Sequence, residues 1–340
     1  MIGTVIKNTG SWYVVRTDDD QLFSCKVKGN FRLRGIRSTN PVAVGDRVEF
    51  KAANNAASSE LGVQSSEDST SNGSGNSALS TLNSELVGLI TDICDRRNYI
   101  IRKASNLSKQ SHILAANVDQ VLLLVTIAHP ETSTTFVDRF LATAEAYRVP
   151  VILVFNKTDI YDEMAQNRMR QLVELYSGIS YTCVPCSALT GEGIAPLTQL
   201  LRDKTTLLSG NSGVGKSTLL NALIPGLKAR TEEISLSHDT GQHTTTYSEL
   251  FDLPTGGSLI DTPGIKGFGT FDIERTEVGH YFREIFTIGQ ECRFQDCTHT
   301  HEPSCAVLQA LEEGRIAQSR YTSYLGMLDD KDEDRYRKPY

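Results

Sequence analysis

Eight consecutive residues, Gly210-Asn-Ser-Gly-Val-Gly-Lys-Ser217, have the composition and spacing that hold a phosphate chain. They fit G-x-x-x-x-G-K-[ST], in which small glycines let backbone N–H groups approach phosphates at the positive end of a helix. We expect Lys216 to reach the β- and γ-phosphates and the Ser217 hydroxyl to bind Mg²⁺. The expected nucleotide-binding residues of this phosphate loop are Asn211, Ser212, Gly213, Val214, Gly215, Lys216, Ser217 and Thr218.

A second motif, Asn156-Lys-Thr-Asp159, fits N-K-x-D and follows the apolar run Val151 to Phe155. The Asp159 carboxylate can accept hydrogen bonds from guanine N1 and the 2-amino group, which adenine does not offer together. We expect Asn156 to brace the loop and contact the base, and the Lys157 stem to cover one face of it. Ser187 and Ala188 resemble an element whose backbone N–H meets guanine O6. The pair of motifs predicts selection of GTP over ATP.

A third motif, Asp261-Thr-Pro-Gly264, fits D-x-x-G. Asp261 ends a predicted strand and can bind Mg²⁺ through water, and Gly264 can donate its N–H to the γ-phosphate. Between this motif and the phosphate loop lies Gly241-Gln-His-Thr-Thr-Thr246, where we favour Thr245 over Thr244 as the residue that completes the Mg²⁺ shell. We expect residues 231–242 to form a mobile switch that the γ-phosphate orders.

The residue after D-x-x-G bears on catalysis. Ras-like enzymes place a glutamine there to orient the attacking water, whereas this chain has Ile265, which cannot form hydrogen bonds. Intrinsic hydrolysis is therefore expected to be slow, or the water is oriented from elsewhere. His243, beside the Mg²⁺ threonine, is the candidate catalytic residue, and a histidine that only packs or caps is the alternative.

The order of the motifs is unusual. Ras-like GTPases run phosphate loop, D-x-x-G, N-K-x-D, whereas this chain runs N-K-x-D, phosphate loop, D-x-x-G. The sequence therefore predicts a circularly permuted GTPase domain.

Cysteine and histidine cluster near the end of the chain, in the pattern C-x4-C-x-H-x5-C. Three thiolates and one imidazole are a usual tetrahedral set for structural Zn²⁺, so one structural zinc ion per chain is expected. The expected ligands are Cys292, Cys297, His299 and Cys305, with His301 as the alternative imidazole. Cys183-Val-Pro-Cys186 is interpreted as strand packing and not as a redox pair, because no helix start follows to lower a thiol pKa.

The elements that must carry these motifs divide the chain into three predicted domains. Short β-rich runs in residues 1–50, with a fifth at 86–91, predict an all-β barrel of OB type over residues 1–111. Residues 51–84 lack aromatic residues and are predicted to be a disordered insertion between the last two barrel strands. Alternating strands and helices predict an α/β P-loop domain over 112–277, followed by a small α-helical zinc-binding domain over 278–340.

Composition limits the setting. The 340 residues carry a net charge of −7, yet residues 1–50 hold eight Lys/Arg against five Asp/Glu, which permits local RNA binding by the barrel. No run approaches a membrane span and no signal peptide is visible, so a cytoplasmic protein without a membrane is expected. Seven cysteines, an odd number, argue against a disulfide framework. No exposed heptad suggests an oligomer, and a monomer is expected.

The motif order, the phosphate loop, Gly241 to Thr246, and Cys292 to Cys305 followed by Ala306-Val307 resemble the RsgA (YjeQ) family of GTPases over nearly the whole chain. The resemblance implies an OB barrel, a permuted GTPase domain and a zinc module that act late in maturation of the small ribosomal subunit. It also implies contact with rRNA, and hydrolysis that the subunit stimulates; the family's switch histidine supports His243. Two departures are visible: the long 51–84 segment, and Ser304 where the family commonly has glycine.

The leading hypothesis is therefore a GTP hydrolase that binds the small subunit and its rRNA, cycles between GTP and GDP, and is released by hydrolysis. The alternative is a zinc-stabilised, GTP-dependent RNA-binding switch with negligible turnover, which Ile265 and the basic barrel favour.

Overall fold

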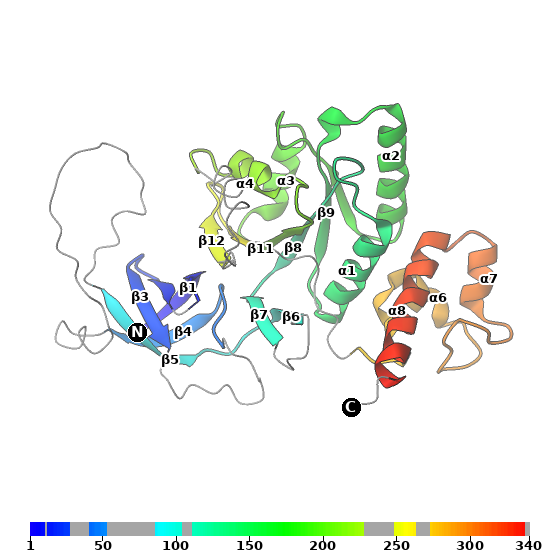
Figure 1. The fold of residues 1–340 in the computed structure, drawn as a ribbon, viewed down its shortest axis with the longest axis horizontal. Helices are drawn as coiled ribbons and strands as arrows, with labels where there is room; N and C mark the ends of the chain where they lie inside the picture. Colours follow the sequence, from blue (N-terminus) through cyan, green and yellow to red (C-terminus); the bar gives the residue numbers. More distant parts are fainter. Residues whose placement is uncertain are drawn as a thin grey trace.

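Three parts of the chain follow one another across the molecule (Figure 1). The computed structural model describes residues 1–10, 12–27, 41–52, 86–103, 111–227, 248–262 and 273–336. A strand barrel at one end and a helical module at the other flank a central α/β part. In these ranges no helix is both long and apolar enough to cross a membrane.

The N-terminal part is a five-stranded barrel. Its strands are β1 (Ile2–Asn8), β2 (Tyr13–Thr17), β3 (Leu22–Val27), β4 (Arg47–Ala52) and β5 (Val87–Ile93). Strand β1 pairs with both β2 and β4, β3 pairs with β2 and β5, and β4 pairs with β5, which closes the barrel. Alternate side chains such as Val5, Val15 and Phe50 fill it, as the two-residue period of strands requires. The predicted OB-like barrel is confirmed, and residues 53–85 between its last two strands lie outside the described residues.

A hairpin of β6 (Tyr99–Lys103) and β7 (Ser111–Ala116) leads into the central sheet. That sheet contains β8 (Gln120–Val125), β9 (Val151–Phe155), β10 (Thr182–Pro185), β11 (Thr205–Gly210), β12 (Ser248–Asp252) and β13 (Ser258–Asp261). The strand order is β10-β9-β8-β11-β13-β12, parallel except for β12. The sequence predicts five of these strands, from β-rich runs at 120–125, 151–155, 181–186, 205–209 and 258–261, but not β6, β7 or β12.

Helices cover both faces of the sheet, as continuous apolar strands require. Helices α1 (Thr134–Ala146) and α2 (Glu163–Gly178) pack on the face that receives Val121 and Leu123. The opposite face, which receives Leu122, packs against α3 (Ile194–Leu201) and α4 (Lys216–Leu223). Strand β8 lies between β9 and β11: the chain runs from β8 to β9 on one side, and later returns to β11 on the other side. The carboxyl ends of β8 and β11 therefore form the switch point at which open α/β sheets bind ligands.

The barrel and the central sheet share hydrogen bonds. Strand β1 pairs antiparallel with β12, so that Lys7 lies opposite Glu249, and the two sheets form one eleven-stranded sheet. Lys7 Nζ lies 3.0 Å from Glu249 Oε2, and Arg16 forms a second ion pair with Asp252. The pairing of β1 with β12 was not expected from the sequence. It connects the barrel to the strand that enters the sheet directly before β13.

The C-terminal module consists of short helices around its own apolar core. Its elements are a 3₁₀ helix, η3 (Arg275–Tyr281), and helices α6 (Arg283–Gly289), α7 (Ala306–Glu312) and α8 (Gln318–Tyr336). Helix α8 lies beside α1 (Figure 1). The buried Arg320 guanidinium lies 2.9 Å from Asp138 on α1 and 2.6 Å from Glu284 on α6. A buried ion network therefore fastens this module to the central domain.

Candidate nucleotide site and metal centre

Three of the predicted motifs meet at the carboxyl edge of the central sheet. The phosphate loop leaves β11, Asn156 follows β9, Ser187 follows β10, and Asp261 ends β13. Parallel strands bring their carboxyl ends to one edge, so residues far apart in the sequence become neighbours. This is the arrangement that the motifs predicted.

The backbone of the phosphate loop requires glycine. Gly213 and Gly215 have φ angles of 81° and 98°, in the left-handed region that residues with a Cβ avoid. Gly215 is also the cap at which α4 begins, so its neighbours' N–H groups lie at the positive end of that helix. Lys216 Nζ donates to the carbonyl oxygens of Gly210 and Asn211, both at 2.7 Å. The loop thus holds the lysine next to the space that phosphates occupy in such loops.

Lys216 and Asp261 influence one another across this edge. Burial lowers the pKa of Lys216, while the Asp261 charge acts in the opposite direction. Burial raises the pKa of Asp261, and Lys216 acts against it. Asp261 Oδ1 and Thr262 Oγ1 are buried without a hydrogen-bond partner in the described part of the chain. An unpartnered carboxylate oxygen near Lys216 fits a site for a hydrated cation such as Mg²⁺.

The Asn156 side chain connects its own segment to the phosphate loop and to the loop after β10. The side chain is 1% exposed. Its Nδ2 donates to Val214 O in the phosphate loop at 2.8 Å, and its Oδ1 accepts from Ala188 N at 3.0 Å. A Cβ on Gly215 would come within 2.4 Å of Asn156 Nδ2, so only glycine permits this approach. The predicted bracing role of Asn156 matches this geometry.

The expected base-reading residues combine one exposed carboxylate with three buried neighbours, Asn156, Ser187 and Ala188. Asp159 is exposed, and its Oδ1 accepts a hydrogen bond from Ser187 Oγ at 2.6 Å. Thr158 Oγ1 donates to Glu192 Oε2 at 3.1 Å, which ties the N-K-x-D segment to the loop after β10. The carboxylate of Asp159 is therefore held in place with its second oxygen available for a ligand.

Several residues outside the sequence motifs also contact this edge of the sheet. Lys157 Nζ donates to the carbonyl oxygen of His129, in the loop after β8. A Cβ on Gly213 would lie 3.3 Å from Pro130 Cδ of the same loop. Tyr161 donates to the Asn156 carbonyl and accepts from Ile127 N at 2.9 Å. Only their position after a buried strand, at the ligand edge of the sheet, could have indicated them.

His243, Thr245 and Gly264 lie outside the described residues. Their expected roles in catalysis, Mg²⁺ binding and γ-phosphate sensing therefore remain predictions.

The four predicted zinc ligands come together in the C-terminal module. The ligand atoms of Cys292, Cys297, His299 and Cys305 all lie within 4.8 Å of one another. Adjacent sulfurs are 3.7 and 3.8 Å apart, and His299 Nδ1 lies 3.4 and 3.6 Å from two of them. With Zn–S bonds of about 2.3 Å, a regular tetrahedron separates two sulfurs by about 3.8 Å. The cluster could therefore hold a zinc ion, with no open position.

The loop around this cluster is held by a single carboxylate and two tyrosines. Glu302 accepts hydrogen bonds from Thr298 N and Thr300 N, at 2.7 and 2.9 Å. The hydroxyls of Tyr321 and Tyr324 on α8 donate to the carbonyls of His299 and Thr298. His299 and Ser304 both have positive φ angles, 55° and 58°. Ser304 thus adopts the left-handed conformation for which glycine is the usual residue.

Cys183 and Cys186 are packing residues in the structure. Cys186 is buried, and burial raises the pKa of its thiol to about 11. Burial also raises the pKa of the Cys183 thiol. A redox pair needs a lowered thiol pKa, so the packing interpretation is supported.

The fold and site define the class of the protein. An OB-like barrel is followed by an α/β domain whose N-K-x-D segment precedes its phosphate loop and D-x-x-G segment, which is the arrangement of a circularly permuted P-loop GTPase. The chain belongs to the RsgA GTPase family. The RsgA GTPase model matches residues 93–271, and the RsgA N-terminal domain model matches residues 2–59.

Similar proteins span the full chain. The chain is 57% identical over 340 residues to "Small ribosomal subunit biogenesis GTPase RsgA" of Bacteroides fragilis, covering 100% of both. It is 54% identical over 343 residues to the protein of the same description from Porphyromonas gingivalis, again covering 100% of both.

Two solved structures are similar in fold. YjeQ from Thermotoga maritima has a TM-score of 0.69 at 35% identity, covering 97% of this chain and 98% of that one. "YloQ, a circularly permuted GTPase" has a TM-score of 0.66 at 28% identity, covering 100% of this chain and 96% of that one. Family membership makes the chain an enzyme that hydrolyses GTP, which favours the hydrolase over a switch with negligible turnover.

Proposed function

We propose that this GTPase acts late in the maturation of the small ribosomal subunit, that the subunit stimulates its hydrolysis of GTP, and that hydrolysis drives its release. The observation that carries the proposal is the full-length likeness to proteins described as small ribosomal subunit biogenesis GTPases. The assembled nucleotide edge of the sheet supports the same function from the residues themselves.

Guanine is recognised by Asp159, with Asn156, Ser187 and Ala188 forming the loop that receives the base. The support for this assignment is the hydrogen bonding of Ser187 Oγ to Asp159 Oδ1 at 2.6 Å, which fixes one carboxylate oxygen and leaves the other for the ligand. Lys157, whose ammonium group is anchored on His129 O, lays its stem along the base. These contacts select GTP and GDP over adenine nucleotides.

Phosphates bind in the loop from Asn211 to Thr218, with Lys216 moving its hydrogen bonds from loop carbonyls to phosphate oxygens. Ser217, Asp261 and Thr245 hold Mg²⁺, which supplies positive charge against the charge that develops on the transferred phosphoryl group. Gly264 contacts the γ-phosphate, and His243 orients the attacking water when the switch segment is ordered by the subunit. The unpartnered Asp261 Oδ1 supports the cation site.

The barrel and the C-terminal module form the surfaces for the subunit and its rRNA. Strand β12 follows the segment that carries His243 and Thr245 and pairs with barrel strand β1. The C-terminal module begins shortly after the D-x-x-G segment. A change at the γ-phosphate can therefore reach the C-terminal module through a short covalent path and the barrel through the pairing of β12 with β1. One structural Zn²⁺ at the cysteine cluster maintains the module. The protein works as a cytoplasmic monomer.

The test is GTP turnover by the full-length protein alone, with purified small subunits, and with purified large subunits. Stimulation by small subunits alone is expected. His243→Ala should abolish most of that stimulation with little change in nucleotide affinity, because the side chain acts on water and not on GTP binding. Equal turnover with and without small subunits contradicts the proposal, and intact stimulation in His243→Ala removes the catalytic role of that residue.

A further inference from the structure

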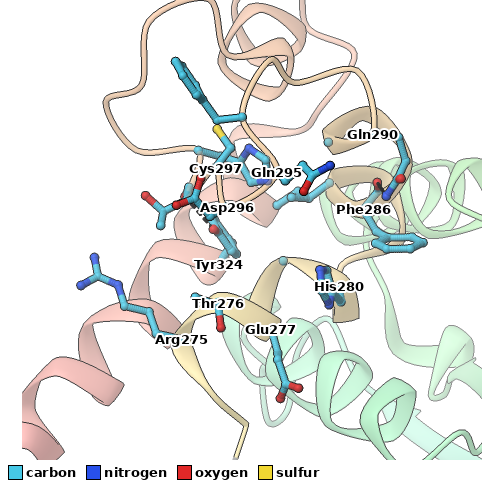
Figure 2. A pocket seen from close by; sticks show the side chains of 16 residues that line it. Arg275, Thr276, Glu277, His280, Phe286, Gln290, Gln295, Asp296, Cys297 and Tyr324 are labelled. Atoms are coloured by element: carbon cyan, nitrogen blue, oxygen red, sulfur yellow. Dashed lines mark hydrogen bonds between the residues drawn. The ribbon is translucent and has the colours of Figure 1, made fainter.

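A pocket of about 250 Å³ opens beside the metal cluster (Figure 2). Its walls come from η3, α6, the cluster loop and α8. Phe286 and Phe294 line it although they are 44% and 40% exposed, so their rings meet both the pocket and solvent. His280 packs edge-on against Phe286 with ring centroids 5.4 Å apart, which holds the Phe286 ring in position. The pocket thus has aromatic walls at its mouth.

The metal ligand His299 forms part of the pocket wall. Its Nδ1 faces the cysteines, and the residue is 7% exposed. The ring edge that carries Nε2 faces Gly279 and Gly289, which also line the pocket; a Cβ on Gly289 would lie 3.3 Å from Nε2. Within the described part of the chain Nε2 has no hydrogen-bond partner. A metal-bound histidine ordinarily donates its second N–H, so the pocket needs an acceptor from a ligand or water.

Acidic residues outnumber basic residues among those that line the pocket, which disfavours an anion inside it. Glu277 and Asp296 are among its lining residues, together with Arg275. Two side-chain amides, Gln290 and Gln295, add neutral donors and acceptors. Small-molecule sites usually have volumes of about 300–1,000 Å³, so this pocket suits a single ring system. The fitting ligand is flat and neutral, with an acceptor for His299 and donors for the carboxylates.

We propose that this pocket takes one unstacked nucleobase of single-stranded RNA, an inference that rests on the proposed function. Proteins read single-stranded RNA by stacking splayed bases on aromatic rings and bonding their edges. The ring stacks on Phe286, a ring nitrogen or carbonyl accepts from His299 Nε2–H, and exocyclic amino groups donate to Asp296. The Arg293 guanidinium lies 5.6 Å from the ring centroid of the lining residue Phe294 and would contact the adjoining phosphate.

The experiment uses the full-length zinc-loaded protein and fluorescent single-stranded RNA of about ten nucleotides, with and without one abasic position. Phe286→Leu keeps the apolar bulk but removes the stacking ring. It should weaken binding of intact RNA about tenfold, within the range of one lost base stack. Phe286→Tyr should bind like the unaltered protein. Met164→Ala, at a 78% exposed position on α2, is the matched control.

Two further readouts separate stacking from other causes. The dependence of affinity on salt should not change in Phe286→Leu, because phosphate contacts are retained. Zinc content of one ion per chain in each variant shows that the module is intact. The Phe286→Leu effect should disappear with RNA that carries the abasic position in the bound register.

Absence of RNA binding by the unaltered protein, or equal affinity of Phe286→Leu, overturns the base pocket. Weaker binding of Phe286→Leu to the small subunit with unchanged RNA affinity also overturns it, and identifies the occupant as a protein side chain. Failure of the proposed function is a different result, namely the absence of subunit-stimulated turnover in the unaltered protein.

Discussion

Asn156 and Val214 connect the base-reading segment to the phosphate loop through one buried hydrogen bond of 2.8 Å. The two residues are 58 positions apart in the chain and belong to different motifs, and this hydrogen bond joins them directly. The same amide accepts from Ala188 N, so one side chain sets the spacing between three loops. Guanine and phosphates must bind at a fixed separation, and this amide maintains it.

Asn156→Ala should therefore impair both nucleotide binding and overall stability. The change leaves Val214 O and Ala188 N buried without hydrogen-bond partners, which costs about 1–3 kcal/mol for each group. Binding of nucleotide would have to restore part of this free energy. We expect GDP affinity to fall about 10- to 100-fold, measured by anisotropy of a fluorescent GDP. Asn167→Ala, on the surface of α2, is the control and should bind normally. Unchanged affinity in Asn156→Ala would show that the loops are positioned by other contacts.

The motifs could be predicted from the sequence because their chemistry requires contiguous residues. The strands β8, β9 and β13 could be predicted because buried parallel strands are continuously apolar. The pairing of β12 with β1 could not, since the segment Ser248–Asp252 has five residues without alternation of apolar and polar side chains, and its partner lies near the start of the chain. Contacts such as Lys157 with His129 depend on the tertiary fold and leave no local pattern.

Lys7 and Glu249 offer a test of the joint between barrel and sheet. Glu249 lies opposite Asp261 on β13, where its charge adds to burial in raising the pKa of Asp261. Lys7→Glu replaces the 3.0 Å ion pair with a repulsion and should destabilise the protein by about 1 kcal/mol, as like charges across strands do. The exchanged pair Lys7→Glu/Glu249→Lys should recover most of the loss, measured by denaturant unfolding. No recovery would show that the pair does not contribute to the joint.

The buried network of Arg320 should contribute more to stability than any surface ion pair. Arg320→Ala leaves Asp138 and Glu284 buried without their cation, which costs about 3–5 kcal/mol. Burial raises the pKa of Asp138, so part of this cost can be relieved by protonation at acidic pH. Arg315→Ala removes an exposed pair with Glu313 and should have little effect on stability, because solvent screens such pairs. Similar losses of stability in the two variants, measured by denaturant unfolding, would show that the buried network does not stabilise the protein more than the exposed pair does.

Removal of metal should unfold the C-terminal module and spare the nucleotide site. The cluster supplies part of the core that also contains Tyr324 and Val307. After chelation we expect a loss of near-ultraviolet circular dichroism and proteolysis within residues 275–336, while GDP affinity changes less than about threefold. Cys305→Ser should behave like the chelated protein, and Cys94→Ser, outside the cluster, should not. A chelated protein that resists proteolysis would show that the four side chains are not a structural metal site.

The thiols outside the cluster should respond to alkaline pH through burial. Burial raises the pKa of Cys25 from its ordinary value of 9.0 to about 12. The unfolded chain loses that proton near pH 9 and the folded chain near pH 12, so the contribution of Cys25 to stability is complete below pH 9 and is lost as pH rises through this interval. The slope is about 1.4 kcal/mol per pH unit for one thiol. Cys25→Ala should show a shallower alkaline decline, measured by urea unfolding from pH 8 to 10.5, and identical declines would contradict the assignment. Alkylation followed by mass spectrometry should also report the raised thiol pKa values. Cys25 and Cys186 should be labelled slowly at pH 8, because both thiols remain protonated.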